Sequence, residues 1–370
     1  MGRDQSPASI RRIGITTGGG DAPGLNAVIR AATLAALHRG WEVTGILRGY
    51  AGLFDTSQTM SLDRQAVRGI AHLGGTILGS QSRGRPFTVY EERADGGRVE
   101  HDRTPEALAG YRALGLDALI AVGGDGSMQL AHHLSQHGVR VVGVPKTIDN
   151  DLSGTVVTFG FDTAVSVATE AVDRLHTTAA SHERVFVIEL MGRYAGWIAL
   201  HAGLAGGADV ILLPEIPYRE ESIYEKIRER EARGRHFSIV VAAEGARPVG
   251  GEVTRVEEGG APGANVRLGG IAKRLERQIQ ENTGKETRSL VLGHLQRGGW
   301  PTARDRVLSL RFGAAAVRAL EAGESGVMVA VDPPDVRTVS LAEATSRMKC
   351  VPVDGDTVRS ARDLGICLGD

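Results

Sequence analysis

Two segments of the chain carry reactive side chains directly after apolar, strand-like runs. Asp149 and Asp151 follow the run 139–144, and Asp125 follows the run 118–122. Continuous apolar runs of this length are typical of strands that are covered on both faces. In open α/β sheets, ligands bind beyond the carboxyl ends of the strands. The pattern therefore predicts a site for phosphate groups and a divalent cation.

Glycine-rich loops accompany these acidic residues. Asp125 lies in GGDGS (123–127), where a helix is expected to begin, and its carboxylate suits Mg²⁺, which proteins hold with one or two carboxylates plus substrate phosphates. The alternative is that Asp125 only caps the helix. The loop GGGDAPG (18–24) would let a phosphate approach backbone N–H groups, although such loops are also simple tight turns. Mg²⁺ is the expected cofactor.

Arginines flank two further strand-like runs, at 185–190 and 289–292. They are Arg184, Arg193, Arg288 and Arg297. The planar guanidinium suits phosphate oxygens, so we expect these side chains to converge on one rim and to hold a substrate with more than one anionic group. For any one of them alone, a surface salt bridge is the alternative.

This combination is what phosphoryl transfer to an alcohol requires: a base, a metal on the donor phosphates, and cations around the migrating charge. The donor phosphates would lie over 18–24 and 123–127. The acceptor would lie over 145–151, where Asp149 would take its proton. Glu244 follows another apolar run and would either bind a sugar hydroxyl or cap the next segment.

Apolar runs alternate with helix-like segments along most of the chain. The strand-like runs are 13–16, 43–47, 118–122, 139–144, 185–190, 209–213, 238–243 and 289–292. Leu25 to His38 has helical spacing, Ser222 to Arg233 is expected to be a charged surface helix, and 245–270 an exposed loop before apolar spacing resumes at Ile271. The alternation predicts an α/β fold with mainly parallel, helix-covered sheets. From Val327 the pattern is irregular and indicates no function.

Composition limits the class of protein. A chain of 370 residues favours two lobes, and a net charge of −1 gives no nucleic-acid footprint. No apolar run reaches the roughly 18 residues that span a bilayer, and Met1 to Arg12 is polar, so we expect a cytoplasmic protein with no membrane partner. Cys350 and Cys367 fit neither a zinc site nor a disulfide framework.

Read together, the motifs closely resemble those of the 6-phosphofructokinase family. In order, they are GGGDAPGLNAVIR (18–30), GGTILGS (74–80), GGDGS (123–127), PKTIDND (145–151), SHERVFVIELMGRYAG (181–196), AEGA (243–246) and TRSLVLGHLQRGG (287–299). The resemblance implies a glycolytic kinase that uses ATP-Mg to phosphorylate the 1-hydroxyl of D-fructose 6-phosphate, giving fructose 1,6-bisphosphate and ADP. It also implies two Rossmann-like lobes. The nucleotide-binding lobe would comprise 10–160 plus about 296–345, and the sugar-phosphate-binding lobe about 161–295 plus the C-terminal segment.

The resemblance also assigns roles by position. Asp149 would be the base that deprotonates the sugar hydroxyl, and Asp125 would serve the Mg²⁺ bound to the nucleotide. The implied nucleotide-binding positions are Gly20, Arg83, Gly124, Asp125, Gly126 and Ser127. The implied substrate-binding positions are Thr147, Ile148, Asp151, Arg184, Met191, Gly192, Arg193, Glu244, Arg288, His294, Leu295, Gln296 and Arg297. Because Arg184 and Arg288 match residues that a neighbouring subunit supplies, the resemblance implies a homodimer or homotetramer with shared active sites.

Two positions separate ATP users from pyrophosphate users in this family. Gly126 is of the ATP type, because an aspartate there would crowd and repel the α-phosphate, whereas Lys146 is of the pyrophosphate type. The combination resembles the mixed-substrate subgroup, and the absence of the block at Gly126 favours ATP. Leu130 stands where many ATP users carry glycine near the adenine. A pyrophosphate-dependent fructose-6-phosphate 1-phosphotransferase is therefore the alternative.

Other functions are less compatible with the motifs. Kinases of NAD or lipids share GGDG but are not expected to carry PKTIDND and MGR. A sugar-phosphate sensor without catalysis would be expected to lack Asp149 or Asp125. A dinucleotide-dependent dehydrogenase needs an acidic residue about 20 positions beyond the glycine loop, where this chain has LRG (47–49). The sequence leaves sedoheptulose 7-phosphate open as a substrate.

Overall fold

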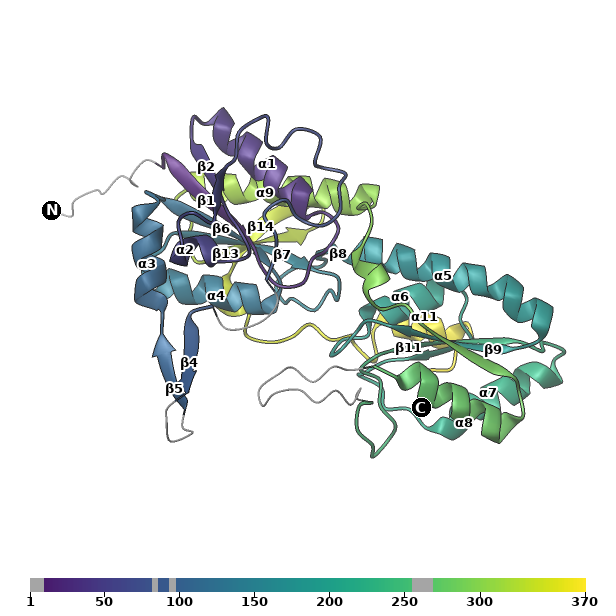
Figure 1. The fold of residues 1–370 in the computed structure, drawn as a ribbon. Helices are drawn as coiled ribbons and strands as arrows, with labels where there is room; N and C mark the ends of the chain where they lie inside the picture. Colours follow the sequence, from purple (N-terminus) through teal and green to yellow (C-terminus); the bar gives the residue numbers. More distant parts are fainter. Residues whose placement is uncertain (1–9, 82–85, 93–97, 255–268) are drawn as a thin grey trace. The chain divides into compact units, whose positions relative to one another are not determined.

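The computed structural model describes residues 10–81, 86–92, 98–254 and 269–370, and the chain divides into two compact units (Figure 1). Unit 1 comprises Met1–Thr147, Leu152–Gly160 and Gly298–Met348. Unit 2 comprises Ile148–Asp151, Phe161–Arg297 and Lys349–Asp370. Each unit is therefore assembled from segments that are far apart in the sequence.

Unit 1 is built on a mainly parallel sheet with the order β14-β13-β7-β6-β1-β2-β3, in which β8 also pairs with β7. The strands are β1 Arg12–Thr17, β2 Glu42–Ile46, β3 Thr59–Ser61, β6 Ala118–Gly123, β7 Val141–Thr147, β8 Phe159–Gly160, β13 Val327–Asp332 and β14 Asp335–Ser340. The edge strands β3 and β14 pair antiparallel with their neighbours. Every residue of β6 and β7 is buried, which explains their continuous apolar sequence.

Helices cover both faces of this sheet (Figure 1). They are α1 Leu25–His38, α2 Ala51–Phe54, α3 Thr104–Ala113, α4 Asp125–Gln136, α9 Ala303–Glu321 and α10 Leu341–Ala344. Along β6, Ile120 and Val122 belong to the apolar cluster with α1 and α9, and Leu119 and Ala121 to the cluster with α4. A separate antiparallel ribbon consists of β4 Thr88–Glu92 and β5 Arg98–Asp102. Successive side chains of β6 point to opposite faces of the sheet, so this one strand contributes to an apolar core on each face.

Unit 2 contains a parallel sheet with the order β10-β11-β9-β12. Its strands are β9 Val185–Leu190, β10 Val210–Leu212, β11 Ser238–Ala243 and β12 Thr287–Val291. Its helices are α5 Phe161–His182, α6 Trp197–Ala205, α7 Glu220–Ala232, α8 Ile271–Thr283, the 3₁₀ helix η1 Gly293–Arg297 and α11 Asp356–Asp363. The α8 helix buries Ile271, Leu275 and Ile279 at a spacing of four residues, which places one apolar stripe on the sheet.

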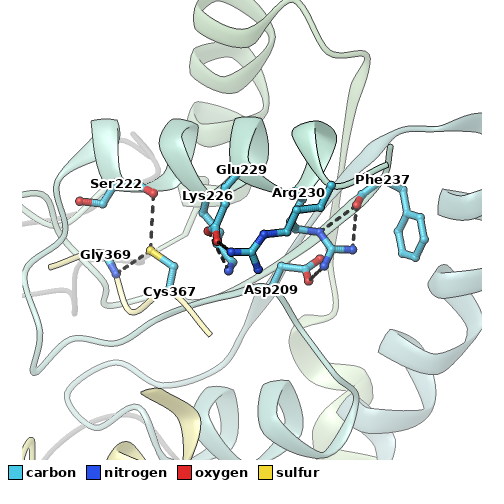
Figure 2. Close-up of polar contacts among 9 residues, drawn as sticks. Asp209, Ser222, Lys226, Glu229, Arg230, Phe237, Cys367 and Gly369 are labelled. Atoms are coloured by element: carbon cyan, nitrogen blue, oxygen red, sulfur yellow. Dashed lines mark hydrogen bonds and ion pairs between the residues drawn. The ribbon is translucent and has the colours of Figure 1, made fainter. Parts of the chain in front are cut away.

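The last residues of the chain extend the β10 edge of this sheet. The Ile211 N–H donates to the Cys367 carbonyl (2.9 Å), and the Cys367 N–H donates to the Asp209 carbonyl (3.0 Å). Figure 2 shows the Cys367 thiol between the Ser222 carbonyl (3.6 Å) and the Gly369 N–H (3.4 Å). Cys367 therefore takes part in anchoring the C-terminus to unit 2.

The structure confirms the α/β class and the sequence-predicted strands. Each strand-like run overlaps a strand, with ends that differ by up to three residues, and the helix expected from Leu25 to His38 has those bounds. The α7 helix begins at Glu220 rather than Ser222. Residues 255–268 of the expected loop lie outside the described residues, and α8 begins at Ile271 as expected.

The region after Val327, whose pattern indicated no regular structure, contains four elements. They are β13, β14, α10 and α11, with irregular segments after α10 and after α11. The period-based prediction missed them because α10 has four residues and β14 is a half-exposed edge strand. Within the described residues, no helix is long and apolar enough to cross a membrane.

Candidate active site

In unit 1, the loops after β1 and β6 lie against each other. The Gly18 N–H donates to the Val122 carbonyl (2.9 Å). A Cβ atom at Gly18 would lie 2.6 Å from the Ser127 hydroxyl oxygen, and one at Gly123 would lie 2.2 Å from the Ser127 Cβ. Only glycine fits such distances, so the two glycine loops pack around Ser127. The structure thus brings together the segments that the sequence predicted for the donor phosphates.

Lys146 reaches the same place from β7. Its side chain is buried, and the ammonium donates to the Gly20 carbonyl. Gly19 has a φ of +77°, and a Cβ there would lie 3.4 Å from the Lys146 Nζ. Strands β1, β6 and β7 are parallel neighbours, which places their carboxyl ends at one sheet edge. We name these three converging segments, 18–20, 123–127 and Lys146, the glycine cradle.

Asp125 is the first residue of α4 within this cradle. The cap position belongs to Gly124, so the alternative in which Asp125 caps the helix is wrong. The Gln129 amide donates to Asp125 Oδ2 (2.8 Å). In the described part of the chain, no three His, Cys, Asp or Glu side chains are placed to hold a metal ion. A single carboxylate nevertheless fits Mg²⁺, whose remaining ligands are commonly phosphate oxygens and water.

Gly126, beside Asp125, faces open space. A Cβ added at Gly126 would meet no atom within 4 Å, in contrast to the crowded Gly123. The room at this position is therefore available to a ligand or to a longer side chain.

In unit 2, the segment Ile148–Asp151 exposes alternate residues. Ile148 and Asn150 are buried, whereas Asp149 and Asp151 are half-buried. Asn150 has a φ of +52°, a left-handed conformation that asparagine tolerates better than most residues. This turn leaves Asp149 and Asp151 partly exposed, although Asp149 Oδ1 is itself buried, while Ile148 and Asn150 are enclosed.

Glu244 and the turn after β9 lie together at the carboxyl ends of β9 and β11. The Glu244 N–H donates to the Leu190 carbonyl (2.8 Å), and the Gly245 N–H donates to the Gly192 carbonyl (3.1 Å). A Cβ at Gly245 would lie 2.1 Å from the Arg193 carbonyl oxygen. Met191, Gly192, Arg193 and Glu244 therefore form one cluster, as the sequence suggested for a sugar-phosphate site.

Glu244 is an unusual carboxyl group. Burial, together with the negative charges of Asp149 and Glu189, raises the pKa of Glu244 to about 7, although the Gly192 amide and Arg193 oppose the rise. Asp149 is thus close enough to Glu244 for their charges to interact. Strongly perturbed pKa values of this kind gather at functional sites.

Glu189 was missed by the sequence reasoning. It is buried on β9 and accepts hydrogen bonds from the Gly270 N–H (3.2 and 3.0 Å) and the Ala272 N–H (3.0 Å) at the start of α8. The sequence could have indicated this role, because a glutamate inside the apolar run VFVIEL (185–190) is expected to be buried and then needs hydrogen-bond donors.

The residues of the helix η1 differ in their exposure to solvent. His294 and Leu295 are exposed, and Arg297 is half-buried. Gln296 is fully buried and donates its amide to the Gly293 carbonyl (3.0 Å). In this structure Gln296 therefore holds η1 in shape. Arg83 lies outside the described residues.

Arg184 and Arg288 lie at the other end of the sheet. Arg184 directly precedes β9 and Arg288 is the second residue of β12, and both form ion pairs with Glu286, Arg184 at 2.9 Å. These two guanidiniums lower the pKa of the Glu286 carboxyl. The expectation that all the arginines share one rim is wrong, because Arg193 follows β9, a strand of six residues that spans about 20 Å.

Comparisons with known proteins agree with the motifs. The family model described as Phosphofructokinase matches residues 12–320. The ATP-dependent 6-phosphofructokinase of Chloroflexus aggregans is 52% identical over 360 residues, 97% of this chain and 98% of that protein. The pyrophosphate–fructose 6-phosphate 1-phosphotransferase of Amycolatopsis methanolica is 53% identical over 344 residues, 92% and 96% of the two chains.

A solved structure shares the fold. The crystal structure of Pichia pastoris phosphofructokinase in the T-state is similar with a TM-score of 0.78 at 30% identity. The match covers 97% of this chain and 37% of the Pichia chain, so this chain spans little more than a third of that relative.

Proposed function

Because the chain belongs to the phosphofructokinase family, we propose that it transfers the γ-phosphoryl group of ATP to the 1-hydroxyl of D-fructose 6-phosphate, giving fructose 1,6-bisphosphate and ADP in glycolysis. The observation that carries the proposal is the glycine cradle, in which three parallel strands bring backbone amides, Asp125 and Lys146 to one sheet edge. Such an edge binds phosphate through N–H groups and a helix N-terminus.

In this proposal unit 1 binds the donor. Gly20, Gly124, Gly126 and Ser127 contribute to the phosphate site, and Asp125 holds Mg²⁺. When bound, Mg²⁺ neutralises part of the charge on the donor phosphates. The glycines allow the phosphates to approach the backbone closely because no Cβ stands in the way.

Unit 2 binds the acceptor and supplies the base. Asp149 accepts the proton of the sugar hydroxyl, which makes the oxygen a better nucleophile. The cluster of Met191, Gly192, Arg193 and Glu244 holds the sugar phosphate. The raised pKa of Glu244 supports this role, because a largely protonated carboxyl below neutral pH can donate a hydrogen bond to a sugar oxygen and does not add full charge beside Asp149.

The donor has one specific competitor. Lys146 donates to the Gly20 carbonyl inside the glycine cradle, and a relative of similar identity is named for pyrophosphate. Both observations favour a pyrophosphate-dependent enzyme as the second candidate. The open space at Gly126 favours ATP, because a nucleotide needs room at that position for its α-phosphate. We therefore keep ATP as the donor.

We also propose a cytoplasmic homodimer or homotetramer with shared sites. The supporting observation is the separation of Arg184 and Arg288 from the cluster around Glu244, since the two sets lie at opposite ends of β9. Residues at the far end of the sheet would complete the site of a neighbouring copy.

The test is an assay of the purified protein with fructose 6-phosphate and Mg²⁺, in which ATP, ADP and pyrophosphate are offered separately. We expect fructose 1,6-bisphosphate to form with a higher kcat/KM for ATP than for pyrophosphate. Sedoheptulose 7-phosphate serves as the comparison acceptor. Absence of fructose 1,6-bisphosphate with every donor would refute the proposal.

A further inference from the structure

A lysine near the C-terminus binds the loop that carries Asp149. Within unit 2, the Lys349 N–H donates to the Asp151 carbonyl (2.8 Å). The ammonium of the same residue donates to Asn150 Oδ1 (2.8 Å), across 199 positions of sequence. One residue thus binds the main chain of the loop and the side chain next to Asp149.

Lys349 is itself held firmly. The Trp197 indole N–H donates to the Lys349 carbonyl (2.8 Å), and the ammonium lies 5.8 Å from the centre of the Trp197 ring. Two residues further on, the Val351 N–H donates to the Glu215 carboxylate (2.8 Å), which also accepts from the Gly196 N–H (3.0 Å). The segment around Lys349 is therefore attached to the start of α6, a regular element of unit 2.

Asn150 is a buried residue in a left-handed conformation. Its φ of +52° is one that asparagine tolerates better than most residues but that glycine adopts more readily. A buried amide oxygen requires a hydrogen-bond donor. Lys349 supplies one. Burial lowers the pKa of Lys349 to about 8, whereas Asp151 opposes this shift, so the side chain is mainly an ammonium at neutral pH. A charged donor forms a stronger hydrogen bond than a neutral one.

We propose that Lys349 is a positioning residue, which fixes the loop 148–151 so that Asp149 meets the acceptor hydroxyl in a reactive geometry. This inference rests on the proposed function, in which Asp149 is the base. A displacement of a catalytic group by about 1 Å can reduce the rate about 10²-fold. Lys349 would therefore affect catalysis without touching either substrate.

The first test is Lys349→Met, which keeps a long apolar side chain and removes the donor. We expect kcat to fall about 10- to 100-fold, while KM for fructose 6-phosphate and ATP changes by less than about twofold. The matched control is Lys285→Met in the same unit, where the lysine pairs with Glu231 (2.5 Å) and donates to the His236 carbonyl (3.3 Å). This control should retain the wild-type kcat.

The second test removes the acceptor instead. Asn150→Gly accepts the left-handed conformation without strain and leaves the main-chain bond of Lys349 intact. We expect the same fall in kcat. The fall in kcat in the double variant should be no larger than in either single variant, because both substitutions remove the same hydrogen bond between Lys349 and Asn150. If Lys349→Met fails to fold, Asn150→Gly decides the question by itself.

The outcomes distinguish a failure of the proposed function from a failure of the positioning role of Lys349. A wild-type protein that does not phosphorylate fructose 6-phosphate overturns the proposed function and this inference with it. If the wild type is active and Asp149→Asn is not, a kcat within about twofold of wild type in Lys349→Met or Asn150→Gly overturns only the positioning role. A rise in KM at unchanged kcat, or additive losses in the double variant, also overturns it.

Discussion

The substitution Gly126→Asp tests which phosphoryl donor the enzyme selects, and we expect it to change the stability of the fold little. A Cβ at Gly126 would meet no atom within 4 Å, and the residue lies in the first turn of α4, where a carboxylate interacts favourably with the helix dipole. Replacing glycine within a helix also improves helix propensity. We therefore expect the thermal stability of Gly126→Asp to equal or slightly exceed that of the wild type.

The expected loss with ATP follows from charge. An aspartate at 126 would stand beside Asp125, where the proposed function places the nucleotide α-phosphate. Two like charges about 4 Å apart at an effective dielectric constant near 20 repel by roughly 4 kcal/mol. That upper-end figure corresponds to about a thousandfold loss in kcat/KM for ATP. Pyrophosphate has no α-phosphate, and Lys146 is already in the glycine cradle, so activity with pyrophosphate should persist or increase.

The assay compares kcat/KM for ATP and for pyrophosphate in the wild type, Gly126→Asp and Gly126→Asn. Asparagine has nearly the size of aspartate without its charge, so it separates crowding from repulsion. We expect Gly126→Asn to retain more ATP activity than Gly126→Asp. A Gly126→Asp enzyme that uses ATP freely, or a wild type that prefers pyrophosphate, would refute the reasoning.

Three further predictions concern unit 2. Asp149→Asn should lower kcat by about 10² to 10⁴ with a modest change in KM, because general-base catalysis contributes that much; steady-state kinetics with a near-normal kcat would contradict the assignment. Arg184→Ala and Arg288→Ala should chiefly raise KM for fructose 6-phosphate, and a fully active monomer on a sizing column would argue against a shared site. Glu244 has a folded-state pKa of about 7, above its ordinary 4.5, so the folded state binds the proton more tightly and stability is lost as pH rises between these values. Thermal unfolding of Glu244→Gln should therefore show a stability gain over wild type that grows from pH 5 to pH 8, and a gain independent of pH would exclude the raised pKa.

The local structure and the candidate site residues near strand ends could be predicted from the amino-acid sequence. The apolar runs became strands because β6 and β7 are buried along their whole length. The glycines at 18 and 123 were informative for a related reason, since any side chain there would collide with Ser127. Such constraints act within a few residues or between adjacent strands, so they leave a direct imprint on composition and spacing.

Contacts between groups that are distant in the sequence became apparent only in the folded chain. Nothing in the irregular segment after Val327 indicated that Lys349 would bind Asn150, or that Arg184 and Arg288 would share Glu286 at the sheet end opposite Arg193. The raised pKa of Glu244 likewise depends on burial and on the charges of Asp149 and Glu189, which come from different strands and loops. These properties arise from desolvation and from contacts across the folded chain, and neither of these is encoded in the spacing of neighbouring residues.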